Sequence, residues 1–75
     1  MAEWDGSNNA PKGKYRVVGT DEFPWPPEDY WVGDCADLTV AKQLANSHVQ
    51  EMASAAVYDE NGKRVFTGRI DGPEV

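Results

Sequence analysis

The chain has little cysteine and little histidine. Its 75 residues contain one cysteine, Cys35, and one histidine, His48. A single cysteine excludes a disulfide within the chain, and a small protein without such cross-links is typical of a reducing compartment. We therefore expect a cytoplasmic protein.

Long apolar runs are also missing. No stretch approaches the roughly 18 apolar residues that a helix needs to span a bilayer. Residues 1–10 have neither a basic start nor an apolar stretch, so we expect no signal peptide. The net charge of −6 disfavours an anionic membrane surface, and we expect no membrane association.

Basic residues are scarce, because 7 Lys and Arg stand against 13 Asp and Glu. Nucleic-acid-binding proteins neutralise phosphates with Lys and Arg, so direct binding of nucleic acid is not expected. The excess negative charge lies in residues 21–37, which contain no Lys or Arg. Their acidic residues are Asp21, Glu22, Glu28, Asp29, Asp34 and Asp37.

The length allows one domain with a small core, since a chain of this size buries only about 60% of the surface that it exposes when unfolded. Residues 1–13 are rich in Gly, Asn, Ser and Pro, which predicts a flexible tail. We expect a single domain over residues 14–70 and a frayed C-terminus over residues 71–75.

Two strands are predicted in the first half of the domain. Residues 14–19 combine β-branched and aromatic residues and end in a glycine, and residues 30–33 resume the same character. We expect these strands to pair as a hairpin. Its connection contains Pro24, Pro26 and Pro27, which lack amide donors and predict a stiff loop.

An amphipathic helix is predicted from Asp37 to about Ser54. The residues on its apolar face, at 100° per residue, are Leu38, Ala41, Ala45, His48, Val49 and Met52. Asp37 is the expected N-cap, with a contribution on the order of 1 kcal/mol. Val40 and Leu44 lie on the flank of this face, where they either cover a sheet edge or are exposed.

The residues from Asp59 to Lys63 predict a second hairpin with one of two registers. A two-residue turn at Asn61 and Gly62 would pair Glu60 with Lys63 and Tyr58 with Val65. A three-residue loop with a left-handed Gly62 would instead pair Asp59 with Lys63 and Val57 with Val65. We favour the second, because it gives Asp and Gly their preferred positions in a type I turn and stacks two valines.

These elements predict a small α+β domain of order β-β-α-β-β, with an antiparallel sheet and the helix packed on one face. The chain resembles a sequence pattern found in small uncharacterised stand-alone α+β proteins of bacteria and phages. The resemblance is carried by residues 15–21, 31–34 and 57–63, and by Ala41 and Ala45 in the helix between them. The resemblance covers residues 14–66. It implies a stand-alone domain and no particular activity.

Catalysis and metal binding have little support. Cys35 has acidic neighbours, Asp34 and Asp37, which raise the pKa of a thiol, and His48 lies more than three helical turns away. His48 and Glu51 are too few ligands for a zinc site. Residues 57–68 lack the first and last acidic ligands of a calcium loop. We expect no enzyme, no metal and no cofactor.

An acidic, aromatic segment is the best candidate for a functional surface. Rigid aromatic residues with a charged rim are typical of interaction hot spots, although a small domain can also fold such a loop over its own sheet. The candidate partner-binding residues are Phe23, Trp25, Glu28, Asp29 and Trp31, with Val40 and Leu44 as an extension.

Our leading hypothesis is a small, acidic, non-enzymatic interaction or regulatory domain that binds a protein partner with a basic surface. The first alternative is an inhibitor that mimics nucleic acid and blocks a DNA- or RNA-binding protein, which requires carboxylates spaced along one face. The second is a self-associating structural domain. We expect a monomer or a weak homodimer.

Overall fold

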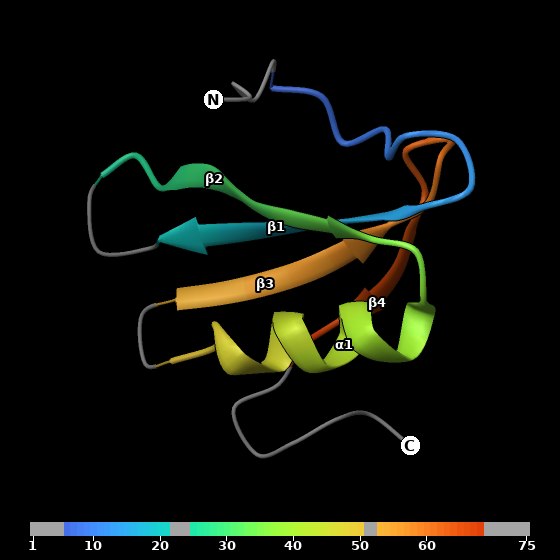
Figure 1. Cartoon of the computed structure of the whole chain (residues 1–75). Coiled ribbons are helices and arrows are strands. Elements are labelled where there is room, and N and C mark those ends of the chain that lie inside the picture. The colour runs from blue at the N-terminus through green and yellow to red at the C-terminus, as the bar shows by residue number, and fades with distance from the viewer. Residues whose placement is uncertain (1–5, 22–24, 51–52, 69–75) are drawn as a thin grey trace.

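Four antiparallel strands and one helix form two layers (Figure 1). The computed structural model describes residues 6–21, 25–50 and 53–68, so the predicted frayed end at 71–75 lies outside it. The elements are β1 (Tyr15–Asp21), β2 (Glu28–Cys35), α1 (Leu38–Ser47), β3 (Ala53–Tyr58) and β4 (Arg64–Thr67). The predicted α+β class and the β-β-α-β-β order are confirmed. In these ranges, no helix is long and apolar enough to cross a membrane.

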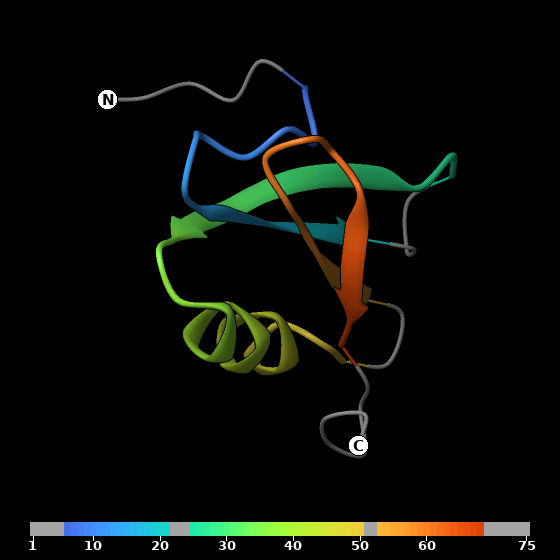
Figure 2. The ribbon, with the colours of Figure 1, turned by 90° about the vertical axis from the view of Figure 1, so that its right-hand side faces the viewer.

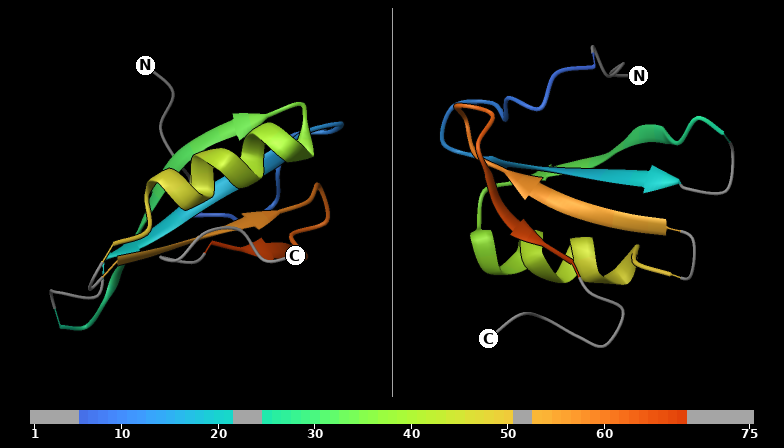
Figure 3. Two further views of the ribbon diagram at one scale, coloured as in Figure 1. Left: turned by 90° about the horizontal axis from the view of Figure 1, so that it is seen from below. Right: turned by 180° about the vertical axis from the view of Figure 1, so that it is seen from behind.

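The sheet has the strand order β2-β1-β3-β4 and curls around α1 (Figure 2). Seen from below, the helix lies along one face of the sheet (Figure 3). The core residues on the two layers are Val17, Ala55, Val57, Phe66, Ala41 and Ala45. The helix contributes only alanines to this buried set, and small side chains let its backbone approach the larger residues of the strands.

The predicted hairpin of the first two strands is confirmed, and it contains a β-bulge. Val17 pairs with Gly33 and Val18 pairs with Trp31, which leaves Val32 as the extra residue. Val32 packs against the core. A bulge disturbs the ladder and increases the local twist. The pairing is regular on both sides of it, and the pairs from Val18–Trp31 to Asp21–Glu28 form an uninterrupted ladder between the bulge and the β1–β2 connection.

The helix is shorter than predicted. It ends at Ser47 with His48 as its C-cap, and the prediction that it continues to Ser54 is wrong. Gln50 and Ala53 exchange two backbone hydrogen bonds of 3.0 Å, which turn the chain back toward the sheet. Residues from Ala53 onward pair with the far end of β1, so strand pairing overrides the helical pattern there.

The start of the helix agrees with the prediction. Asp37 has an extended backbone, and its Oδ1 accepts a hydrogen bond of 2.7 Å from the amide of Thr39. Ala41 and Ala45 of the predicted apolar face are fully buried. Met52, predicted on the same face, lies outside the described residues.

The turn of the second hairpin has the favoured geometry. The amide of Asp59 donates to the carbonyl of Lys63 at 2.9 Å, and Gly62 has a φ of 78°. The Asp59 carboxylate also accepts hydrogen bonds of 2.9 Å from the amides of Asn61 and Lys63. The three-residue loop with a left-handed glycine is therefore confirmed.

The predicted pairing of Val57 with Val65 is wrong. Val57 pairs with Phe66 because a second bulge follows the turn. Phe66 is 8% exposed and Val65 is 39% exposed, so the bulge buries the larger side chain and leaves the smaller one outside. Lys42 of α1 places its Nζ 5.4 Å from the centre of the Phe66 ring.

Part of the predicted flexible tail, residues 1–13, is attached to the second hairpin. The amide of Ala10 donates to the carbonyl of Asp59 at 3.1 Å, and the amide of Gly13 donates to Glu60 Oε1 at 2.8 Å. Ala10 is buried. These contacts place this segment on the side of the sheet opposite α1 (Figure 2).

Candidate functional site

The connection between β1 and β2 presents a tryptophan to solvent. Trp25 is 89% exposed, and Pro26 and Pro27 after it are also exposed. The peptide bond between Trp25 and Pro26 is cis. Trp25 does not fold over the sheet, whereas Phe23, the other aromatic residue predicted in this loop, lies outside the described residues.

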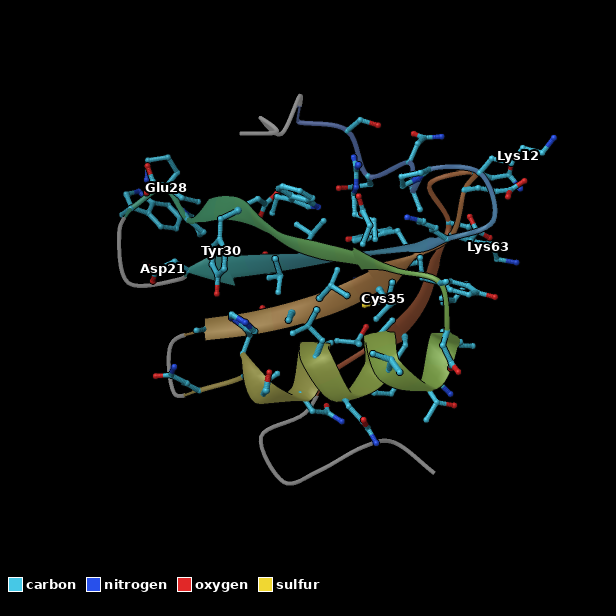
Figure 4. The ribbon with its side chains drawn as sticks, viewed as in Figure 1. Lys12, Asp21, Glu28, Tyr30, Cys35 and Lys63 are labelled. Atoms are coloured by element: carbon cyan, nitrogen blue, oxygen red, sulfur yellow. The ribbon has the colours of Figure 1, made fainter. Side chains whose placement is uncertain are left out.

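Acidic residues lie beside Trp25 at the same end of the sheet. Asp21 pairs with Glu28 across the two strands, and Thr20 donates a hydrogen bond of 2.7 Å to Asp29. Figure 4 shows Asp21 and Glu28 at one end of the molecule and Lys12 and Lys63 at the other. We name Asp21, Trp25, Glu28 and Asp29 the acidic end.

Two carboxylates of the acidic end are cross-strand neighbours. Like charges directly opposite one another on neighbouring strands are destabilising, and Asp21 and Glu28 are such a pair. Glu28 and Asp29 are exposed, so neither carboxylate is buried in the domain. Their position favours a role outside the fold.

Asp34, farther along β2, belongs to a network within the domain. Its carboxylate accepts hydrogen bonds from Arg16 Nε at 2.9 Å and Arg16 Nη2 at 3.2 Å, and from Trp31 Nε1 at 3.3 Å. Arg16 Cζ lies 5.9 Å from the centre of the Trp31 ring, and Arg16 Nη1 donates to the carbonyl of Ser7. Trp31 is therefore half-buried and engaged with its own sheet, unlike Trp25.

Opposing effects act on the pKa of the Asp34 carboxyl. Burial raises this pKa, whereas the hydrogen bonds from Arg16 and Trp31 and the positive charges of Arg16 and Lys14 lower it. The lowering effects prevail, and the pKa lies below its ordinary value. Asp34 is therefore ionised and paired at neutral pH.

The acidic residues of the segment thus have separate roles. Asp34 is held by Arg16, Asp37 caps the helix, and the acidic end carries the others that are described. Glu22 lies outside the described residues. A mimic of nucleic acid needs carboxylates spaced along one face, and the described ones do not favour that arrangement.

The side chain of Tyr30 in β2 contacts β1 and lies near the C-terminal end of α1. Its ring lies over Gly19, and its centre is 6.3 Å from the centre of the His48 ring. Tyr30 is still partly exposed beside the acidic end. Tyr30 is not among the site residues predicted from the sequence. The sequence signal for this contact is a glycine, Gly19, in one strand and an aromatic residue in the strand that pairs with it.

Val40 and Leu44, the predicted extension of the binding surface, lie on α1 apart from the acidic end. Leu44 packs against the core and lies 3.6 Å from a Cβ built on Gly33, so it covers the edge strand β2. Val40 is 49% exposed in the first turn of α1. It follows the C-terminal end of β2, whereas Trp25 precedes the N-terminal end, and a strand of eight residues spans about 26 Å.

Cys35 and His48 are not placed for joint chemistry. They lie at opposite ends of α1, and its ten residues span about 15 Å. Burial, and then the negative charges of Asp34 and Asp37, raise the pKa of the Cys35 thiol. Within the described part of the chain, no group of three or more His, Cys, Asp or Glu side chains could hold a metal ion.

A pocket of about 220 Å³ lies where β1 begins and β3 ends, at the other end of β1 from Asp21. Its lining residues are Gly13, Lys14, Tyr15, Asp59 and Glu60. The side chains of Asp59 and Glu60 hold the turn and the N-terminal segment by hydrogen bonds. Both carboxylates are therefore used in the fold.

Comparisons with protein-family models, curated proteins and solved structures found no match to this chain. The resemblance to small α+β proteins of bacteria and phages stays a prediction.

Proposed function

We propose that the chain is a non-enzymatic interaction or regulatory domain that binds a protein partner through its acidic end. The observation that carries this proposal is the exposure of Trp25, at 89%, beside the exposed carboxylates of Glu28 and Asp29. Tryptophan is enriched among the few residues that supply most of the energy of an interface. Its exposure to water costs free energy that a partner would recover.

The chemistry of the acidic end defines the partner. A surface with Lys and Arg around an apolar pocket would complement the carboxylates and receive the indole ring. Such charge complementarity mainly accelerates and selects the encounter, and it weakens with rising salt. The prolines after Trp25 restrict the loop, so less conformational entropy is lost on binding.

We propose a cytoplasmic location and a monomeric or weakly dimeric state. The single cysteine, which forms no cross-link within the chain, supports the reducing compartment. The negative charge of the acidic end supports the monomer, because two such ends repel one another.

Co-purification from the native host, followed by identification of the captured proteins, tests the proposal. The test variant combines Trp25→Ala with Asp29→Asn. Asparagine keeps the Oδ1 acceptor that Thr20 uses, so the hairpin retains this hydrogen bond. The matched control is Val40→Ala, which removes an exposed apolar side chain at the other end of β2.

We expect the double variant to lose the partner and the control to retain it, with both melting temperatures close to that of the wild type. A folded double variant that captures the same partner in the same amount would overturn the proposal.

A further inference from the structure

The two edges of the sheet differ in their capacity to accept another strand. β4 has four residues, contains the bulge at Val65 and begins with Arg64 directly after Lys63. Short length, bulges, prolines and charged side chains, lysine above all, are features by which proteins protect sheet edges. The β4 edge is therefore protected.

The β2 edge is longer, and in its first half the carboxylates of Glu28 and Asp29, rather than a bulge or basic residues, are what discourage strand pairing. β2 has eight residues, and within the described residues it pairs with β1 only. The bulge at Val32 lies in its second half. The first half, from Glu28 to Trp31, keeps an uninterrupted ladder with β1, so its outer backbone groups form a regular template.

This regular edge adjoins Trp25. Glu28, Asp29 and Tyr30 are exposed, and Trp25 stands just before them in the chain. A strand added along β2 would have one end next to the chain segment that carries Trp25. Strand addition obtains affinity from main-chain hydrogen bonds and specificity from the side chains next to the edge.

Charge decides which strand fits. The β2 strand of a second copy would bring the same carboxylates, and like charges on neighbouring strands are destabilising. A segment with Lys or Arg would place opposite charges next to Glu28 and Asp29.

We infer that the partner adds an extended, Lys- or Arg-containing segment as a fifth strand along Glu28–Trp31. This inference rests on the proposed function and specifies how the acidic end engages its partner.

The experiment uses the full chain labelled with ¹⁵N and a synthetic peptide of alternating Lys and Val. Two control peptides have the same length. One carries N-methyl groups on its central backbone amides, which removes the donors that strand pairing needs, and the other has Glu in place of Lys. NMR titration and amide hydrogen exchange report binding residue by residue.

We expect the Lys-Val peptide to bind and to slow amide exchange within residues 28–31, with no change in residues 64–67. The N-methylated peptide should bind at least about tenfold more weakly, because each lost hydrogen bond is worth about 1 kcal/mol. The Glu peptide should bind more weakly than the Lys peptide, and the difference should shrink with added salt.

Three results would overturn strand addition. In the first, the Lys-Val peptide binds only with a dissociation constant above about 1 mM. In the second, the N-methylated peptide binds as tightly as the Lys-Val peptide. In the third, the Lys-Val peptide binds but leaves amide exchange in residues 28–31 unchanged. Protection of these amides that grows with protein concentration, without peptide, would assign the edge to a second copy and also overturn it.

The same readout separates this inference from the proposed function. A captured partner that depends on Trp25 but leaves the amides of residues 28–31 unprotected would refute strand addition alone. Loss of the Lys-Val peptide's protection pattern in Glu28→Lys, with the pattern retained in Val40→Ala, would support the charge argument.

Discussion

The ring of Tyr30 occupies the space that a side chain on Gly19 would need. A Cβ on Gly19 would overlap Tyr30 Cζ and would lie 2.7 Å from Tyr30 Cε2. The glycine in β1 thus lets the aromatic side chain of β2 lie flat across the strand and reach His48. This contact fixes the hairpin at the end that carries Trp25.

Gly19→Ala should therefore destabilise the domain, by about 1–3 kcal/mol, because the new methyl group displaces the Tyr30 ring. Urea unfolding measures the change. In a Tyr30→Ala background the same substitution should cost much less, since the obstructing ring is gone. Equal costs in the two backgrounds would contradict the contact.

The ion pair between Arg16 and Asp34 should make the stability depend on pH. The pKa of Asp34 is lower in the folded chain than its ordinary value of 3.8. Its contribution is therefore complete above the ordinary pKa and is lost as the pH falls through the lower folded pKa.

Urea unfolding between pH 7 and pH 2 tests this linkage. Asp34→Asn should reduce stability at pH 7 by about 1–3 kcal/mol, because Arg16 loses a charged partner. The difference in free energy of unfolding between the wild type and Asp34→Asn should become smaller below pH 4. If the free energies of unfolding of the wild type and Asp34→Asn differ by the same amount at every pH, the Asp34 carboxylate does not make the stability depend on pH.

Asp37→Ala should remove the helix cap and cost about 1 kcal/mol. The amide of Thr39 would lose its acceptor at 2.7 Å. Asp37→Ser is the matched control, since serine also accepts at this position, and it should retain most of the stability in thermal unfolding. An Ala variant as stable as the Ser variant would argue against the cap.

The thiol of Cys35 should react slowly with a maleimide or disulfide reagent at pH 7. Burial and the charges of Asp34 and Asp37 raise its pKa above the ordinary value of 9.0, so the reactive thiolate is scarce. The labelling rate should increase with pH up to and beyond that value. Fast labelling at pH 7 that follows the titration of His48 would instead indicate a catalytic pair.

The sequence predicted the features that depend on neighbouring residues. The cap at Asp37 and the left-handed Gly62 follow from local turn and helix chemistry, and both are present. The exposure of Trp25 also agrees with its position among prolines, which limit packing against a sheet.

The sequence did not predict features that depend on distant residues. The helix ends early because the residues from Ala53 onward pair with β1, and the bulge before Phe66 reflects the fit of that ring into the core. The sequence groups Asp34 with the other acidic residues of 21–37, but in the structure Asp34 forms an ion pair with Arg16 of the neighbouring strand.

The most direct test of the account is the dissociation constant of the co-purified partner for wild type and Trp25→Ala, measured beside both melting temperatures. We predict a loss of at least about 2 kcal/mol in binding free energy, as for a central interface tryptophan, with an unchanged melting temperature. An unchanged dissociation constant, or a loss of binding that accompanies a large drop in melting temperature, would contradict the account.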